Sequence, residues 1–244
     1  MFKDKIIIVT GSSSGIGKEI ALAFAREGAN VVITYKENKI GVEEVAAQIN
    51  AFGGCVLIIQ ADLTSDKDAK NVVEKAKEKF GRIDILVNNA GRYIDGDEWD
   101  GGAEIWMKSL QQNLISVMSM SKYAIEIFQQ QKAGVIVNIA GRYSLDGQYD
   151  ALAYAAAKAG VVNITQAYAK LLAPFGRANS VSPGAVNTGY WLTAPKEELE
   201  KNLANISSGK LVEPKEIAEE VLFLASEKAS DITGQNIFID GSVL

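Results

Sequence analysis

Tyr154 and Lys158 are the residues of this sequence best suited to proton transfer. They stand four positions apart in an alanine-rich stretch, 151–172, that favours a helix, so both side chains should leave the same helical face. A nearby ammonium favours the phenolate and would lower the pKa of the tyrosine from its reference value of about 10. Tyr35 and Lys39 have the same spacing, so the structural context must distinguish the two pairs.

The chain has 244 residues and no histidine. This excludes Ser-His-Asp and Cys-His nucleophilic schemes and any metal site with histidine ligands. Acid–base chemistry must therefore use tyrosine, lysine, aspartate or glutamate. We expect no metal centre.

The formal net charge is −5, and no stretch gathers lysine and arginine without acidic residues between them. This excludes nucleic-acid and anionic membrane surfaces as partners. No targeting or membrane-spanning segment is evident, so we expect a cytoplasmic protein. Cys55 is the only cysteine and adjoins the apolar run 56–59, which predicts a buried, unreactive thiol.

A glycine-rich turn near the N-terminus indicates where a ligand would bind. The apolar run 6–9 leads through the turn 10–17 into a helical pattern, 15–28. The first turn of such a helix has free N–H groups and the positive end of a dipole, which suit a pyrophosphate. Any turn from a strand to a helix also favours glycine and serine, so the turn alone leaves both interpretations open.

Strands and helices alternate along the rest of the chain. Apolar runs predict strands at 6–9, 30–35, 55–60, 83–88, 135–139, 177–181 and 236–239, and helical patterns lie at 15–28, 42–49, 66–80, 103–131, 151–172 and 214–226. Continuously apolar strands between helices belong in a parallel sheet covered on both faces. We predict a single-domain doubly wound α/β (Rossmann) fold over 1–244, with a seven-stranded parallel sheet and a substrate-covering loop at about 184–213.

Ligands of such a fold lie beyond the carboxyl ends of the strands. Asp62 follows the third strand, where its carboxylate could accept from an adenine amino group or be a residue of the following turn. Arg92 and Arg142 follow the fourth and fifth strands. They could bind an anionic group of a substrate, or form surface ion pairs with Asp95, Asp97, Asp146 and Asp150.

Several motifs in this order resemble the short-chain dehydrogenase/reductase family, and most of all its 3-oxoacyl-carrier-protein reductase type. The resemblance spans nearly the whole chain and rests on Thr10-Gly-x-x-x-Gly-x-Gly17, Asn88-Asn89-Ala90-Gly91, Asn113, Tyr154-x-x-x-Lys158, Pro183-Gly184, Thr233-Gly234-Gln235 and Asp240-Gly241. It implies hydride transfer between a nicotinamide cofactor and a small-molecule carbonyl or secondary alcohol. It also implies a homotetramer or a homodimer.

The resemblance further implies a role for each matching residue. Tyr154 would be the general acid, and Lys158 would bind the nicotinamide ribose and lower the pKa of Tyr154. Asn113 would hold a water in a proton relay, although it could equally satisfy backbone groups of its own helix. The implied cofactor-binding residues are Gly11, Ser13, Ser14, Gly15, Ile16, Gly17, Tyr35, Lys36, Asp62, Leu63, Asn89, Ala90, Gly91, Tyr154, Lys158, Pro183, Gly184, Val186 and Thr188.

One position departs from the family's pattern. The family has a serine thirteen positions before the tyrosine, and here that position is Gly141. One hydrogen-bond donor to the reacting oxygen is therefore missing. Our hypothesis is that Ser144 partly replaces it; the other possibilities are that the substrate or a water supplies the bond, or that catalysis has been lost. The alternative function is a dinucleotide-binding protein with little or no turnover that acts through cofactor-dependent contacts with a partner.

The residues after the second strand bear on the choice of cofactor. Tyr35 stands where an acidic residue would bind the ribose hydroxyls of NAD, and Lys36 and Lys39 follow. The mainly positive charge predicts NADP in preference to NAD.

Overall fold

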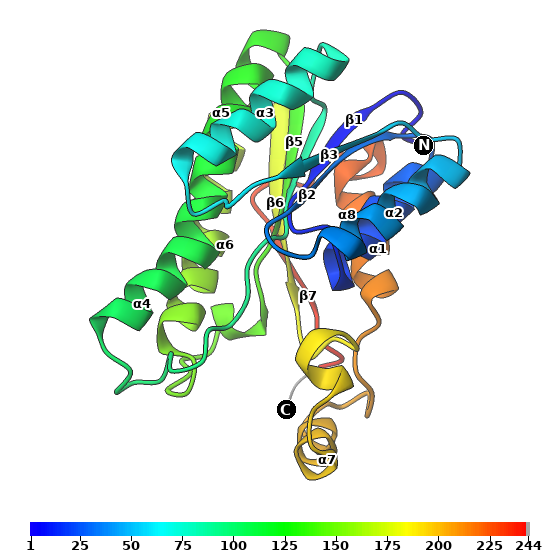
Figure 1. Ribbon diagram of the computed structural model, residues 1–244. Coiled ribbons are helices and arrows are strands. Elements are labelled where there is room, and N and C mark those ends of the chain that lie inside the picture. The colour runs from blue at the N-terminus through cyan, green and yellow to red at the C-terminus, as the bar shows by residue number, and fades with distance from the viewer. Residues whose placement is uncertain (243–244) are drawn as a thin grey trace.

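The computed structural model describes residues 1–242 and contains a seven-stranded sheet in the order β3-β2-β1-β4-β5-β6-β7 (Figure 1). All six neighbouring pairs are parallel. The strands are β1 (Ile6–Val9), β2 (Asn30–Tyr35), β3 (Val56–Gln60), β4 (Ile85–Asn88), β5 (Gly134–Ile139), β6 (Gly176–Pro183) and β7 (Asn236–Ile239). The predicted doubly wound parallel fold is confirmed.

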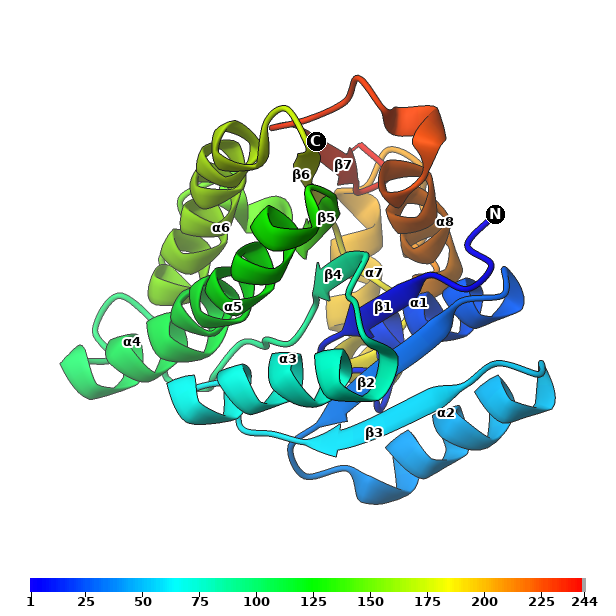
Figure 2. The same ribbon diagram turned by 90° about the horizontal axis from the view of Figure 1, so that it is seen from above.

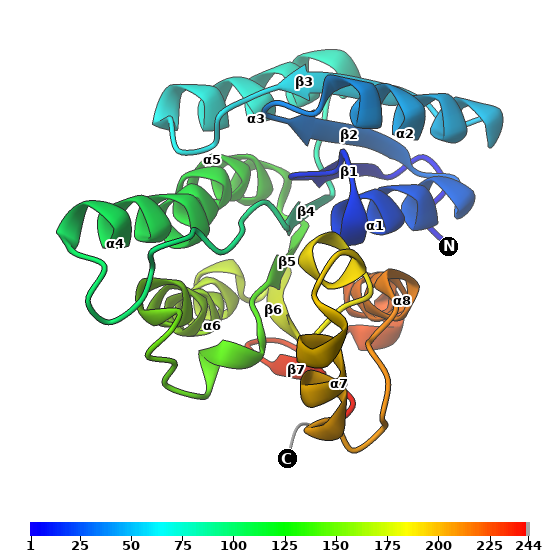
Figure 3. The same cartoon turned by 60° about the horizontal axis from the view of Figure 1, so that its bottom comes forward.

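Helices cover both faces of the sheet (Figures 2 and 3). One face carries α1 (Gly15–Arg26), α2 (Lys39–Ala51) and α8 (Pro214–Ala225), and the other carries α3 (Asp66–Phe80), α5 (Ser116–Gln131) and α6 (Leu152–Leu172). Alternate residues of a strand enter opposite cores: Ile7 packs on the α1 side and Ile8 on the α3 side. Burial on both sides explains why these strands are continuously apolar.

The edge of the sheet corrects one prediction. Cys55 is exposed, not buried. It precedes β3, which pairs only with β2 at the margin of the sheet, and Ile58 in β3 is itself 38% exposed. The apolar run does not distinguish an edge strand from a central one, so it gave the wrong environment for the thiol.

The long helical stretch predicted at 103–131 is interrupted. It consists of α4 (Ala103–Leu110), a π-helical turn (Gln111–Ile115) and α5. Asn113 lies in the π turn and is fully buried. Single π turns inside α-helices are frequent at functional sites because they change the direction of a side chain.

A buried polar network fixes the strands that lead to the site. The side-chain amide of Asn88 in β4 donates to Asn138 Oδ1 in β5 at 2.8 Å and to Ser121 Oγ in α5 at 3.0 Å. The Asn138 amide donates in turn to Thr165 Oγ1 of α6 at 2.8 Å. The network therefore joins two central strands to two helices on one face of the sheet.

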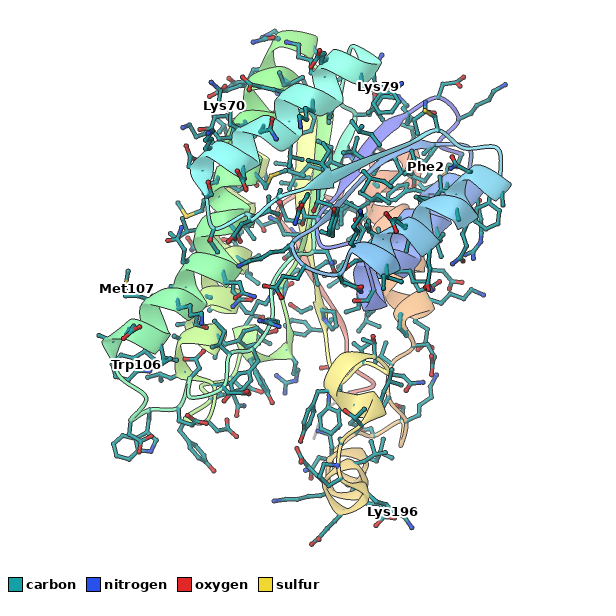
Figure 4. The ribbon with its side chains drawn as sticks, in the orientation of Figure 1. Phe2, Lys70, Lys79, Trp106, Met107 and Lys196 are labelled. Atoms are coloured by element: carbon teal, nitrogen blue, oxygen red, sulfur yellow. The ribbon has the colours of Figure 1, made fainter. Side chains whose placement is uncertain are left out.

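The segment between β6 and α8 projects beyond the sheet (Figure 1). A parallel bridge between Val186 and Val212 joins its two ends, and α7 (Lys196–Ala204) contains no buried residue. Lys196 extends from α7 away from the rest of the chain (Figure 4). That this segment covers a substrate remains a prediction.

Among residues 1–242, no helix is long and apolar enough to cross a membrane.

Candidate active site

A cleft of about 280 Å³ opens where the strand order reverses between β1 and β4. Such a reversal is where doubly wound folds bind their ligands. Nine predicted cofactor residues line it: Gly11, Ser13, Tyr35, Lys36, Asp62, Leu63, Asn89, Ala90 and Gly91. The sequence analysis did not assign the other lining residues to the cofactor: Thr34, Glu37, Asn38, Ala61, Thr64, Arg92, Gln112 and Ser116.

The glycine-rich turn packs closely against the segment after β4. Gly11 has a φ of +63°, and a Cβ there would lie 2.9 Å from the Cα of Ala90. A Cβ on Gly17 would overlap the Gly11 carbonyl and the Asn89 amide. Only residues without side chains allow this contact. The first turn of α1 has no side-chain cap and no acidic residue, so its N–H groups and dipole can bind an anion.

The segment after β6 lies against the same turn. A Cβ on Gly15 would be 2.8 Å from Thr188 Oγ1, which places Thr188 directly beside the first turn of α1. Val186 forms a backbone bridge with Val212, and its side chain is buried in the core. Pro183 ends β6 and is followed by Gly184.

Asp62 is a turn residue in this structure. Its Oδ1 accepts hydrogen bonds from the Thr64 amide at 3.1 Å and the Thr64 hydroxyl at 2.7 Å. Its Oδ2 lies 2.8 Å from Lys36 Nζ. The hydrogen bond from Lys36 lowers the pKa of Asp62, so Lys36 already has a carboxylate partner. A contact between Asp62 and adenine remains a prediction.

Tyr154 lies in the first turn of α6 between two other tyrosines. Its ring meets the rings of Tyr93 and Tyr143 edge to face, with both centroid distances 6.4 Å. Burial, with a smaller contribution from Tyr143, raises the pKa of Tyr154 to about 12. We expected Lys158 to lower this pKa. The pKa instead rises because the phenol is buried, so the phenol is protonated at neutral pH.

Lys158 lies one helical turn beyond Tyr154, and only 4% of it is exposed. Its Nζ donates to the carbonyl oxygen of Ile139 at 2.9 Å and lies 5.5 Å from the centre of the Tyr154 ring. Burial lowers the pKa of Lys158 to about 8. The ammonium is therefore mostly charged at pH 7 and loses its charge in mildly alkaline solution.

Asn113 satisfies backbone groups, as expected, and its role in a proton relay stays a prediction. Its amide donates to the carbonyl oxygens of Arg92 and Ser109 at 2.9 and 3.0 Å. Its Oδ1 is buried and accepts no hydrogen bond from the described residues. A Cβ built on Gly91 would lie 2.6 Å from this oxygen and 3.7 Å from Lys158 Nζ. The free oxygen of Asn113 and the ammonium of Lys158 therefore both lie near Gly91, and the missing side chain of Gly91 leaves space between them.

Gly141 lies beside the phenol. Its φ of 170° is ordinary extended backbone, and a Cβ there would lie 3.8 Å from Tyr154 Oη. A larger residue fits without strain at this position. The nearby Ser144 directs its Oγ to Ser182 Oγ, 3.4 Å away, and its catalytic role remains a prediction.

The two arginines have different surroundings. Arg142 forms ion pairs with Asp146 at 2.5 Å, as expected, and with Asp240 at 3.1 Å, which the sequence did not indicate. These carboxylates occupy its guanidinium. Arg92 lines the cleft. Asp97, an expected surface partner, is instead fully buried against α6.

Known proteins resemble this chain over almost its whole length. A family model described as enoyl-(acyl carrier protein) reductase matches residues 11–243. A 3-oxoacyl-(acyl-carrier-protein) reductase of Thermotoga maritima is 36% identical over 98% of both chains. A meso-2,3-butanediol dehydrogenase of Serratia marcescens is 35% identical over 98% of this chain and 94% of the other.

A crystal structure of an actinorhodin polyketide ketoreductase variant with NADPH matches at a TM-score of 0.91. That chain is 29% identical, and the match covers 99% of this chain and 98% of the other. The similarity therefore includes the strands, the turns and the helices that form the cleft.

Replacing Lys158 with methionine should stabilise the protein at pH 7. Folding lowers the pKa of Lys158 from 10.5 to about 8, which disfavours the folded state wherever the lysine is charged. At about 1.4 kcal/mol per pKa unit, less about 1 kcal/mol for the bond to Ile139, Lys158→Met should raise the free energy of unfolding by about 1–3 kcal/mol.

The pH dependence of the stability difference between wild type and Lys158→Met is the control for this prediction. Between pH 8 and 10.5 the unfolded wild type binds more protons than the folded one, so wild-type stability rises with pH relative to the variant. Urea unfolding at pH 7 and at about pH 10 measures both values. A variant less stable at pH 7, or a difference independent of pH, would contradict the prediction.

Proposed function

Because this chain belongs to the short-chain dehydrogenase/reductase family, we propose that it is an NADP-dependent oxidoreductase that interconverts a carbonyl and a secondary alcohol. The observation that carries the proposal is the position of the Tyr154 phenol in the first turn of α6, one helical turn from the buried ammonium of Lys158. Asn113 directs a free oxygen to the same place. The resemblance also supports a homotetramer or a homodimer, which remains a prediction.

The cleft suits a dinucleotide. The uncapped first turn of α1 offers N–H groups to a diphosphate, and Gly11 and Gly17 allow the close backbone approach. Asn89, Ala90 and Gly91 line the cleft and would contact the adenosine side of the cofactor, and Lys158 would bind the nicotinamide ribose. A reduced nicotinamide, when bound, supplies the hydride.

The side chains of the chain itself supply the proton. Tyr154 is protonated at neutral pH and donates to the carbonyl oxygen of the substrate. The positive charge of Lys158 then stabilises the phenolate that remains. Without this charge, burial would make the phenolate unfavourable, because burial raises the pKa of the phenol. Asn113 Oδ1 accepts a hydrogen bond from a water that returns a proton toward Lys158 and Tyr154.

Removing the phenol tests the function. Wild type should oxidise NADPH with at least one member of a panel of ketones, 3-oxoacyl thioesters and sugar-derived carbonyls. Tyr154→Phe should reduce kcat by about 10³-fold or more, since it removes the proton donor, and Tyr123→Phe, which removes a hydroxyl that donates from α5 to Asp66, should leave kcat unchanged. The measurement is the decrease in NADPH absorbance.

Gly141 is the observation that favours the alternative function, a dinucleotide-binding protein without turnover. Tight NADPH binding with no turnover on the whole panel would support that alternative. Tyr154, Lys158 and Asn113 favour the enzyme, because nucleotide binding alone does not require a proton donor with a relay behind it.

Restoring the missing hydroxyl should increase turnover. A Cβ at position 141 has ordinary contacts and lies 3.8 Å from Tyr154 Oη, so Gly141→Ser places a second donor near the reacting oxygen. One such donor is worth about 10²–10³ in rate in other enzymes, and we expect an increase in kcat of about 10-fold or more. Gly141→Ala, which adds the same Cβ without a hydroxyl, should give no increase.

The role of Ser144 is tested by placing Ser144→Ala in both the wild type and the Gly141→Ser variant. If its hydroxyl replaces the missing serine, Ser144→Ala lowers kcat in the wild-type background and has a smaller effect in Gly141→Ser. Equal kcat values for wild type and Ser144→Ala would show that the hypothesis is wrong.

NADP is supported by the charge at the end of β2 and by the ketoreductase structure that contains NADPH. Lys36 and Arg92 line the cleft, and only Glu37 and Asp62 oppose them there. Lys36→Ala should weaken NADPH binding by about 10-fold, the effect of losing one charge-assisted hydrogen bond, and change NADH binding by less than about 2-fold.

Fluorescence titration measures both dissociation constants. Lys39→Ala is the matched control, because Lys39 is exposed and pairs with Glu43 at 3.7 Å outside the cleft. A wild type that binds NADH more tightly than NADPH would overturn the cofactor assignment.

A further inference from the structure

Asp97 is a buried carboxylate that the proposed proton transfer does not use. It lies in the segment between β4 and α4 and is fully buried. Its Oδ1 accepts from the Ala153 amide at 2.9 Å, and its Oδ2 accepts from the Tyr154 amide at 2.8 Å and from Ser109 Oγ at 2.6 Å. All of these bonds are to α4 and α6, the helices around the proposed site.

The first turn of α6 depends on this carboxylate. The N-cap position holds Ala151, which forms no side-chain cap. Helices lacking such a cap leave N–H groups unsatisfied and tend to fray in the first turn. Asp97 supplies the missing acceptors from a distant part of the chain, and its charge also suits the positive end of the helix dipole.

Tyr154 is the third residue of α6 and therefore lies in the turn that would fray. Lys158, one turn further, has its own bond to Ile139. The backbone of Tyr154 is held by Asp97, whose backbone carbonyl also accepts from the Leu152 amide at 2.7 Å. The orientation of the phenol is thus more dependent on Asp97 than the orientation of the ammonium is.

The same carboxylate is connected to Asn113. Ser109 donates its hydroxyl to Asp97, and its carbonyl oxygen accepts from the Asn113 amide at 3.0 Å. The segment that carries Asp97 is also anchored to α4, because Trp106 (Figure 4) donates its indole N–H to the Glu98 carbonyl at 2.9 Å. One side chain therefore joins the helix that carries Tyr154 to the π turn that carries Asn113.

We propose that Asp97 is a positioning residue that holds the first turn of α6, and with it the Tyr154 hydroxyl, in place relative to Asn113. This rests on the proposed function. A proton donor acts efficiently only when it is held in its reactive geometry before the substrate arrives.

Asp97→Asn tests the proposal with little change in shape. An amide has one acceptor oxygen and presents N–H groups to donors, so it cannot satisfy Ala153, Tyr154 and Ser109 together. We expect faster hydrogen exchange at the Ala153 and Tyr154 amides, with the second half of α6 unchanged. We also expect kcat to fall by about 10–100-fold while KM and the dissociation constant for NADPH stay within about 3-fold.

Asp84→Asn is the matched control. Asp84 is also buried and accepts a backbone hydrogen bond, from Ile6 at 2.9 Å, but it lies at the amino ends of β1 and β4, opposite the cleft. Its loss should lower the unfolding temperature and leave kcat and the exchange at α6 unchanged. If Asp97→Asn does not fold, Ser109→Ala removes one of the same bonds and should lower kcat by about 2–10-fold.

Two outcomes would overturn the proposal. Unchanged exchange at Ala153 and Tyr154 would show that Asp97 does not hold this turn. Equal losses of kcat in Asp97→Asn and Asp84→Asn would show an effect of general stability. Failure of the proposed function is distinguishable, since it would appear as absence of carbonyl turnover in the wild type while the exchange experiment still decides the role of Asp97.

Discussion

Lys158 keeps an ammonium group inside the protein, and within residues 1–242 its one hydrogen-bond partner is the carbonyl oxygen of Ile139. A buried ammonium loses most of its hydration, and this loss lowers the pKa of Lys158. The fold tolerates this because β5 and α6 are held by other contacts, among them the Asn138–Thr165 hydrogen bond. The site thus contains a buried charge that lowers stability in a well-packed molecule, as is common where residues serve chemistry more than stability.

The parallel sheet explains why this charge is close to the cleft. Because every strand runs in the same direction, the residues after β1, β4, β5 and β6 meet at one edge. Gly11, Gly91, Gly141 and Gly184 each follow one of these strands. A side chain at Gly11 or Gly184 would collide with neighbouring backbone, whereas Gly141 has free space. The glycine at 141 is therefore not required by packing, which separates it from the others.

The sequence predicted the elements whose patterns repeat and missed the features set by long-range contacts. Strand positions, helix positions and the nine cleft residues follow from apolar runs and from motifs with fixed spacing. The exposure of Cys55 depends on which strand is at the edge, and local sequence does not encode that. The pKa of Tyr154 depends on how much of the phenol is buried, and spacing to Lys158 gave the wrong direction. The roles of Asp97 and Asp240 come from contacts across more than fifty positions of chain.

The bridge between Val186 and Val212 joins the two ends of the excursion that carries α7. Both valines are in the core, but the helix between them has no buried residue. Replacements within α7 would leave the interior packing as it is, whereas Ile206, which follows the helix, is buried. Evolution can thus alter the surface of α7 almost independently of the scaffold, and a laboratory library confined to α7 would vary that surface with little loss of folding stability.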